Sequence, residues 1–382
     1  MAFLTRPTRY DIKDSNIELL GSDLEKHVRE HAGDTEAAWQ SAGKAPGLQI
    51  WRIEKFTIQE WPRSRYGTFY DGDSYIVLHT FKLTKDDDRL SYDLHFWLGE
   101  NTSQDEAGTA AYKTVELDDN LGGAPVQYRE VQGSESSRFL SYFPSFVCLQ
   151  GGVSTGFHHV TSTPPPEAPR LYRISVVDPG HDSTRSHLVV HEVSATAPSV
   201  QQGDVYVLDL GTNVMQFNTR DSVGRERFKA AEFLQSLVQE REGQCESAVF
   251  DEGEHGSGSF LSVLGTETVH AKIRSEPVHG GAQALFRLTD ESGQVALEPV
   301  APSRASLSSS DAFLLDASSN RASPAIYVWI GREASLAERR LSLQYAQWYL
   351  HRHRGGGDLA ATSIVKMNEG SESEIFWQVL VD

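Results

Sequence analysis

The feature that most constrains this chain is one composite pattern that occurs three times in its 382 residues. Each copy opens with a strand that carries an aromatic residue between aliphatic ones, at residues 48–53, 171–174 and 285–288. An acidic turn then leads into a near-continuous apolar strand, at residues 72–78, 203–208 and 310–315. A second apolar strand follows at residues 95–99, 214–217 and 326–331. Self-similarity of this kind predicts tandem copies of one structural unit.

Each copy continues with a long predicted helix, at residues 103–117, 222–238 and 335–350, and a short apolar piece, at residues 139–143, 260–264 and 375–380. Continuous apolar strands are typical of a sheet that is covered on both faces. Strands followed by helices, in units of about a hundred residues, indicate α+β domains. We therefore predict three tandem α+β domains.

The first long helix has two distinctive features. Ser103 and Glu106 fit a capping box, which predicts the helix start. Small residues recur at helical spacing, at Ala107, Ala110, Ala111 and Thr114. One interpretation is a helix with one face on its sheet and the other offered to a partner; the alternative is a helix that only packs on its own sheet.

Composition shifts suggest the domain boundaries. Residues 1–45 form a predicted leader with a possible short helix at residues 23–31, and residues 46–160 form the first repeat. Residues 161–268 hold a proline-rich linker (161–169) and the second repeat, and residues 269–382 a weaker linker and the third. Proline-rich linkers are semi-rigid spacers.

Composition also excludes several classes of protein. The formal net charge of −18, from 53 acidic and 35 basic residues, argues against nucleic acid as a partner, because phosphate binding needs a basic surface. The N-terminal residues lack the apolar run of a signal peptide, and no stretch approaches the roughly 20 apolar residues of a transmembrane helix. Cys148 and Cys245 suggest no disulfide framework, so we expect a cytoplasmic location.

Long ordered motifs resemble the gelsolin/villin family, and the three-repeat length resembles its severin and fragmin members. The resemblance is strongest in GLQIWRIEKF, YGTFYDGDSYIVLHTFK, SQDEAGTAAYKTVELDDNLGGAPVQYR and LQGGVSTGF. It implies gelsolin-like domains, each a central mixed β-sheet between one long and one short helix. It also implies a cytoskeletal, calcium-regulated actin-binding protein that severs filaments and caps their barbed ends. The alternative function is calcium-dependent capping or monomer binding without severing.

The resemblance implies one calcium site within each repeat. Calcium prefers six to eight oxygen ligands, mixing carboxylates with backbone carbonyls. The implied ligands are Gly72, Asp73, Glu106 and Val153; Gly203, Asp204 and Glu226; and Ser310, Asp311 and Glu338. The alternative is that Glu106 and Glu338 are plain capping-box residues and that the aspartates are ordinary turn residues. Glu226 favours the ligand role, because Ser222 stands four residues before it and breaks the box register.

The resemblance implies a second kind of calcium site at Asp118, with the carbonyls of Gly123 and Pro125, which a carboxylate of actin completes. The first long helix would enter a cleft of actin, with Tyr112 where the family has an apolar residue. The implied actin contacts are Gln104, Ala107, Ala111, Tyr112, Val115, Asp118 and Asp119 on this helix, and Arg225, Arg227 and Lys229 on the second. The alternative for the basic cluster is a solvated helix face.

An enzyme is the main rival class. Three histidine pairs suggest metal ligands, at positions 158 and 159, 187 and 191, and 351 and 353, but no cysteine or carboxylate falls at a matching zinc spacing. We therefore expect no catalytic role. Few Lys or Arg residues occur in residues 144–150 and 170–178, so we also expect phosphoinositide binding to be weak or absent.

Overall fold

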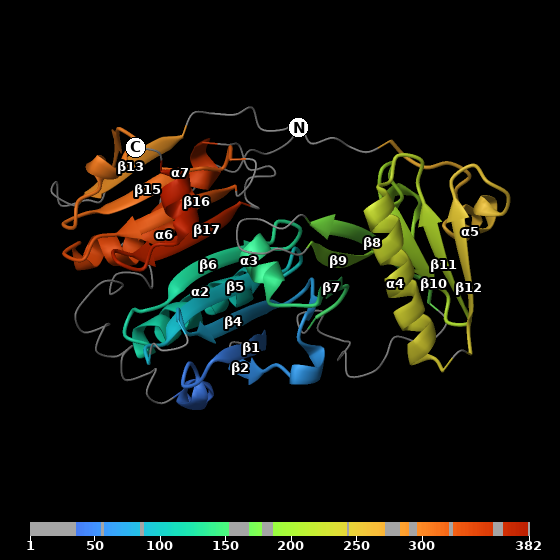
Figure 1. The fold of residues 1–382 in the computed structure, drawn as a ribbon, viewed down its shortest axis with the longest axis horizontal. Coiled ribbons are helices and arrows are strands. Elements are labelled where there is room, and N and C mark those ends of the chain that lie inside the picture. Colours follow the sequence, from blue (N-terminus) through green and yellow to red (C-terminus); the bar gives the residue numbers. More distant parts are fainter. Residues whose placement is uncertain are drawn as a thin grey trace, which may run out of the picture.

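The computed structural model describes residues 36–54, 57–84, 88–152, 168–177, 186–242, 244–271, 283–289, 296–320, 324–353 and 362–380. Its strands form two sheets, flanked by helices (Figure 1). None of the helices within these ranges has the length and apolarity needed to cross a membrane. The predicted short helix at residues 23–31 and residues 161–167 of the predicted linker (161–169) lie outside the described residues.

The first repeat builds the sheet order β2-β1-β4-β5-β6. Its strands are β1 (Gly47–Glu54), β2 (Thr57–Glu60), β4 (Ser74–Phe81), β5 (Ser91–Leu98) and β6 (Val126–Val131). The long helix α2 (Gln104–Asn120) buries Ala110 and Leu117 on one face, and the short helix α3 (Ser137–Ser141) buries Phe139 and Leu140 on the other. Only β5 and β6 pair in parallel within this group, so the sheet is mixed.

The second repeat has the same plan. Its strands are β8 (Arg170–Val177), β9 (His187–Val193), β10 (Val205–Asp209), β11 (Asn213–Asn218) and β12 (Glu246–Asp251). The long helix α4 (Gly224–Glu240) packs through Ala230 and Leu234 on one face. The short helix α5 (Ser257–Val263) packs through Phe260 and Leu261 on the other.

The third repeat follows the same order again. Its elements are β13 (Ala284–Thr289), β14 (Ala296–Val300), β15 (Ala312–Asp316), β16 (Ala325–Ile330), α6 (Leu336–His353), β17 (Ser363–Asn368) and α7 (Glu374–Val379). Ala346 and Leu350 of α6 pack on one face of the sheet, and Phe376 and Val379 of α7 on the other. The prediction of a mixed sheet between one long and one short helix in each repeat is therefore confirmed.

Both sheets cross from one repeat to another, which the sequence did not indicate. Strand β17 of the third repeat pairs antiparallel with β6 of the first, with Val365 opposite Tyr128, and this joins ten strands into one sheet. Two short strands of the first repeat, β3 (Thr68–Tyr70) and β7 (Ser145–Leu149), extend the sheet of the second repeat through β9. The predicted boundaries between the repeats stay a prediction, because residues 153–167 and 272–282 lie outside the described ranges.

Short helical turns precede several strands, at η2 (Ala37–Ser41), η3 (Arg63–Arg65), η4 (Ala197–Ser199) and η5 (Arg304–Ser306). The first of them lies in the predicted leader and packs on the first repeat. Trp39 is 2% exposed and meets Trp51 edge to face, with ring centroids 5.2 Å apart. The end of the leader is therefore part of the first core.

Candidate functional site

The predicted site of the first repeat lies where a turn meets the start of α2. Asp73 follows Gly72 in the turn before β4 and is fully buried. Its carboxylate accepts a hydrogen bond from the Tyr75 hydroxyl at 3.1 Å and faces the Arg52 guanidinium at 3.5 Å. The turn packs against the backbone of Gly152, where an added Cβ would lie 2.5 Å from Asp73 Oδ1. Val153, the next predicted ligand, lies outside the described residues.

Glu106 supplies the second carboxylate of this site. Its backbone N–H donates to Ser103 Oγ at 3.1 Å, so Ser103 caps α2 as predicted. The side chain is 7% exposed, and its Oε2 atom is buried without a hydrogen-bond partner among the described residues. Burial raises the pKa of this carboxyl group, although bonds to Ser103 and the charge of Arg52 act in the opposite direction. A buried acceptor without a donor is costly, and a divalent cation would satisfy it.

In the second repeat, Gly203 has a φ of 87°, which glycine adopts without strain, and Asp204 accepts from the Tyr206 hydroxyl at 3.3 Å. Glu226 lies in the first turn of α4, whose N-cap residue, Val223, offers no side-chain cap. Its Oε1 atom accepts from the Val176 backbone N–H at 3.4 Å. Glu226 is therefore placed outside any capping box, and its role as a ligand stays a prediction.

In the third repeat Glu338 forms a capping box, and its role as a calcium ligand stays a prediction. Ser335 N–H donates to Glu338 Oε2 at 2.9 Å, and Glu338 N–H donates to Ser335 Oγ at 3.1 Å, which completes a capping box. The Ser310 hydroxyl donates to Asp311 Oδ2 at 2.9 Å, and Arg287 lies 3.9 Å from Oδ1 of the same carboxylate. Protein donors thus engage the predicted carboxylate ligands of this repeat.

The second kind of predicted site lies at the other end of α2. Asp118 Oδ2 accepts from Gln127 Nε2 at 2.7 Å, whereas Oδ1 is buried without a partner among the described residues. Burial raises the pKa of this carboxyl group to about 6, and the charge of Asp119 adds to the effect. The predicted ligand carbonyl of Gly123 accepts from Asn368 Nδ2 at 2.6 Å. A side chain of the third repeat therefore caps this site, while Pro125 is buried beside it.

The predicted contact face of α2 divides by burial. Tyr112 is 44% exposed and Asp119 is exposed, whereas Ala107, Ala111 and Val115 are half-buried. Among the small residues, Ala110 and Thr114 pack inward against the sheet. The side chain of Gln104 lies outside the described parts of the chain.

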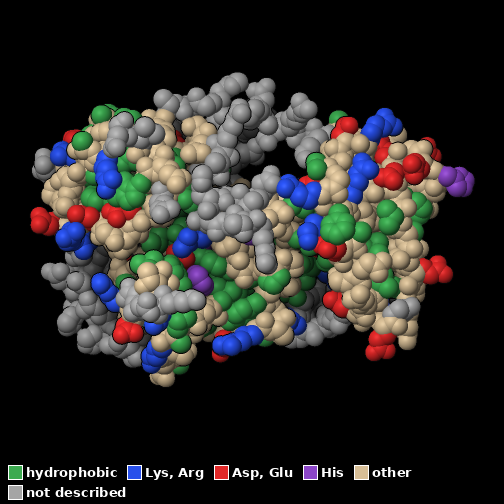
Figure 2. All heavy atoms as spheres, in the orientation of Figure 1, with side chains coloured by type: hydrophobic (Ala, Val, Ile, Leu, Met, Phe, Trp, Pro, Cys, Tyr) green, Lys and Arg blue, Asp and Glu red, His purple; other side chains and the backbone are tan. Residues whose placement is uncertain are grey.

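The basic cluster on α4 is only partly free to contact a partner. Arg227 donates to Asp251 Oδ1 at 3.2 Å and to Ser222 Oγ at 2.9 Å, so it holds the start of α4 to its own domain. Lys229 pairs with Glu232 at 2.6 Å, and Arg225 is exposed. Phe228, between them in sequence, is 63% exposed. Figure 2 shows basic side chains beside hydrophobic ones over the part of the molecule that α4 occupies.

Sequence reasoning missed the residues that oppose or cap these sites. Arg52 faces Asp73, and its counterparts recur at the same position in the opening strand of each repeat, at Arg173 and Arg287, which was a readable signal. Asp71 holds the glycine pair by accepting from Gly151 N–H at 2.8 Å. Asn368 gave no signal, because its position depends on how the repeats pack together.

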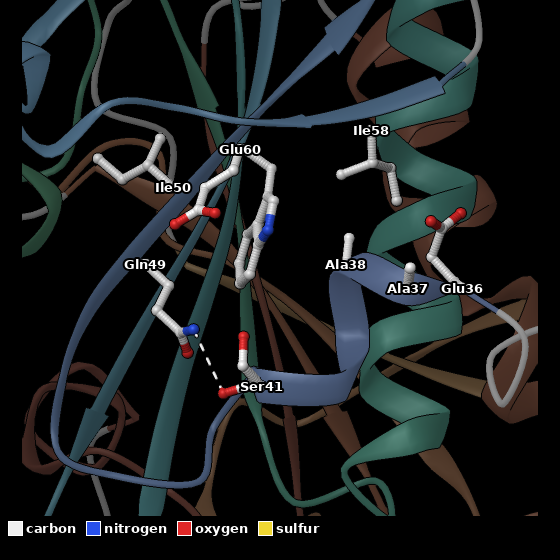
Figure 3. Close-up of a pocket in the computed structure, with 9 residues that line it drawn as sticks. Glu36, Ala37, Ala38, Ser41, Gln49, Ile50, Ile58 and Glu60 are labelled. Atoms are coloured by element: carbon white, nitrogen blue, oxygen red, sulfur yellow. Dashed lines mark hydrogen bonds between the residues drawn. The ribbon is translucent and has the colours of Figure 1, made fainter.

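One pocket and the histidine pair at residues 187 and 191 can be compared with the predicted calcium sites. The pocket, of about 260 Å³, lies between η2 and strands β1 and β2 (Figure 3), and none of the residues that line it is a predicted ligand. Gln49 Nε2 donates there to the Ser41 carbonyl at 3.3 Å (Figure 3). Within the described parts of the chain, no three His, Cys, Asp or Glu side chains gather as a metal cluster. Burial lowers the pKa of His191 to about 4, so this imidazole is neutral at pH 7.

Comparison with known proteins agrees with this architecture. The family described as "Gelsolin repeat" matches residues 55–140 and 293–377. The chain is 39% identical to "Gelsolin-like protein 1" of Lumbricus terrestris over 350 residues, covering 90% of this chain and 89% of that protein. It is 36% identical to "Severin" of Echinococcus granulosus over 361 residues, covering 92% of each. Against "Gelsolin" of Gallus gallus it is 36% identical, covering 90% of this chain and 43% of that protein. The chain therefore belongs to the gelsolin family.

Proposed function

We propose that this protein binds actin, severs actin filaments and caps their barbed ends under the control of calcium. Family membership over about nine-tenths of the chain supports the actin-directed activity. The observation that carries the regulatory part is the junction of β17 with β6, which brings the third repeat to the end of α2. Actin is the proposed partner, Ca²⁺ the proposed cofactor and the cytoplasm the proposed compartment, and no catalytic role is proposed.

The described arrangement fits a closed state. Asn368 occupies the Gly123 carbonyl, and the charge of Lys366 acts on Asp118 from the neighbouring strand. A partner that approached Asp118 along α2 would meet β17 at this end of the helix. For the third repeat to move away from α2, Asn368 must lose its hydrogen bond to Gly123, and Lys366 must leave the neighbourhood of Asp118. New interactions have to compensate for this loss.

Calcium binding would provide the compensating interactions. An ion shifts a conformational equilibrium only through its differential affinity for the two states. Calcium would be held by Glu106 and Asp118, each of which has one buried oxygen with no hydrogen-bond partner among the described residues. At Asp118 we propose that an actin carboxylate completes the shell, so that calcium and actin each strengthen binding of the other.

We assign different actin-binding roles to the exposed face of α2 and to the start of α4. The face of α2 around Tyr112 would enter an actin cleft, where the tyrosine ring contributes contact area and its hydroxyl needs a polar partner or water. The start of α4, with Arg225 and Lys229, would hold the filament side while the first repeat reaches a subunit junction. We assign Arg227 to holding α4 in place, since Asp251 and Ser222 already bind it.

Imaging of labelled actin filaments tests this function. We expect internal breaks and arrested barbed-end growth at saturating calcium, and intact growing filaments in a chelator. Asp118→Ala is expected to weaken the calcium dependence of actin binding with the fold unchanged, whereas Asp73→Ala removes a ligand from the first repeat. Filaments that stay whole and keep growing at saturating calcium would contradict the proposal, and arrested growth without breaks would establish the capping-only alternative.

A further inference from the structure

An arginine stands at the same place in the opening strand of each repeat. Arg52 lies opposite Tyr75, Arg173 opposite Tyr206 and Arg287 opposite Phe313 in the antiparallel registers. In each case the turn aspartate precedes the register partner by two residues, at Asp73, Asp204 and Asp311. Residues two apart on a strand share a face, so each arginine is directed to the side of the sheet on which its aspartate lies.

The first repeat shows the closest pairing. Arg52 Nη1 lies 3.5 Å from Asp73 Oδ2, with side chains 17% and 0% exposed. Burial alone would lower the pKa of Arg52, but Asp73, Tyr75 and Glu54 together raise it above its ordinary value. The guanidinium is therefore a permanent positive charge beside the site.

The pairing weakens in the later repeats. Arg287 lies 3.9 Å from Asp311 and is 31% exposed, and it also bonds Glu298 at 3.1 Å. In the second repeat, Arg173 lies opposite Tyr206 in the strand register, and the Tyr206 hydroxyl donates to Asp204 at 3.3 Å. The arginine therefore has the same register position in all three repeats, and its contact with the turn aspartate is shorter in the first repeat than in the third.

Arg52 also contacts two groups other than Asp73, and these could hold its guanidinium in an alternative position. Its Nη2 atom lies 3.2 Å from Glu54 Oε2, and its guanidinium lies 5.2 Å from the centre of the Trp61 ring. A carboxylate on one side and an aromatic face on the other can hold the cation if it leaves Asp73. Displacement of Arg52 from Asp73 would therefore not leave its guanidinium buried without a partner.

We propose that Arg52 is a resident cation of the calcium site in the first repeat, and that calcium binds by displacing it from Asp73. This inference rests on the proposed calcium site and adds how its affinity is set. Two cations compete for the same carboxylate oxygens, so the arginine weakens calcium binding and holds the site together in its absence.

Calorimetric titration of the full chain with calcium chloride tests this competition. Arg52→Met, which keeps a comparable side-chain stem without the charge, is expected to bind calcium about tenfold more tightly at the first-repeat site. Arg52→Lys, a shorter cation that retains the charge, should fall between this variant and the native chain. The matched control is Arg65→Gln, which removes another cation over the Trp61 ring, at 5.6 Å, and should leave the titration unchanged.

A second measurement separates competition from a general structural role. Without calcium, the melting temperature of Arg52→Met should fall by roughly 2–4 °C, because Asp73 loses its cation, and saturating calcium should restore it. In an Asp73→Asn background, Arg52→Met should no longer change calcium affinity.

The outcomes show whether only the competition between Arg52 and calcium is wrong or whether the first repeat has no calcium site at all. Weaker or unchanged calcium binding by Arg52→Met, in a chain where Asp73→Asn does reduce binding, overturns the competition alone. An Asp73→Asn titration identical to that of the native chain removes the proposed calcium site and the inference with it. Arg287→Met provides the same comparison in the third repeat, where the expected gain in affinity is smaller.

Discussion

At the residue scale, Asp118 shows how burial prepares a carboxylate for a cation. Its side chain is 7% exposed, and one oxygen has no hydrogen-bond partner among the described residues. Burial raises its pKa from 3.8 to about 6, so the folded state favours the neutral form. Because a raised carboxyl pKa means that the folded state binds the proton more tightly, stability from this group is fully present below about pH 4. It is lost as pH rises toward 6.

Asp118→Asn tests this reasoning in calcium-free buffer. The variant keeps an acceptor for Gln127 and removes the buried charge, so its free energy of unfolding at pH 7 should exceed the native value by up to about 3 kcal/mol. The difference should disappear below about pH 4, where the native aspartate is protonated. Denaturant unfolding at several pH values measures it, and equal stability at pH 7 would show that the ionised carboxylate is well solvated.

At the scale of elements, the end of the leader fixes the helix that carries the proposed actin surface. Trp39 Nε1 donates to Glu116 Oε1 at 2.7 Å, and Glu116 is 1% exposed. Lys113 Nζ lies 3.0 Å from both Glu36 and Glu116, which adds an ionic contact between the leader and α2. These contacts hold α2 along the side next to Tyr112, because residues four apart on a helix share a face. The end of the leader therefore fixes the part of α2 from which Tyr112 projects.

Trp39→Phe separates the hydrogen bond from the packing. Phenylalanine keeps much of the aromatic contact with Trp51 but leaves the buried Glu116 oxygen without its donor, which should cost roughly 1–3 kcal/mol of stability. Trp39→Ala should cost roughly 3–5 kcal/mol, because it also opens a cavity. Denaturant unfolding measures both, and a phenylalanine variant as stable as the native chain would contradict the role given to this bond.

At the scale of the whole molecule, the ten-stranded sheet couples the first repeat to the third. Gln127 lies opposite Lys366 in the β6–β17 register, and Tyr128 of the first repeat is buried in the core of the third. The Arg129 guanidinium donates to the Thr362 carbonyl at 3.4 Å, and burial lowers its pKa to about 10. The junction thus combines main-chain pairing, apolar packing and buried polar contacts.

Asn368→Ala is expected to loosen this junction. Its bond to the Gly123 carbonyl is worth roughly 0.5–1.5 kcal/mol, so the calcium concentration for half-maximal actin binding should fall about fivefold. Asn213→Ala, the same change in the second repeat, is the control and should leave this concentration unchanged. Co-sedimentation with actin over a calcium series measures the shift, and an unchanged midpoint for Asn368→Ala would mean that the bond does not restrain opening.

Much of the fold was predictable because its signals are local. The strand at residues 72–78 and the helix starting at Ser103 depend on apolar runs and one capping serine, and both occur as predicted. The same local signals placed the turn aspartates and helix-start glutamates of the three proposed sites. They did not separate ligand from cap: Glu338 and Ser335 form a complete capping box, whereas Glu106 keeps one unpartnered oxygen among the described residues.

The sequence by itself determined the repeated unit, because alternating burial, capping and turn formation depend on residues that are neighbours in the chain. The recurring arginine at Arg52, Arg173 and Arg287 was also readable, because Arg52 reaches Asp73 within one repeat. Only the tertiary structure decided which groups of another repeat cap a proposed site: Asn368 reaches Gly123 across 245 positions. That contact depends on how the edge strands of two repeats meet, and no spacing within one repeat encodes that geometry.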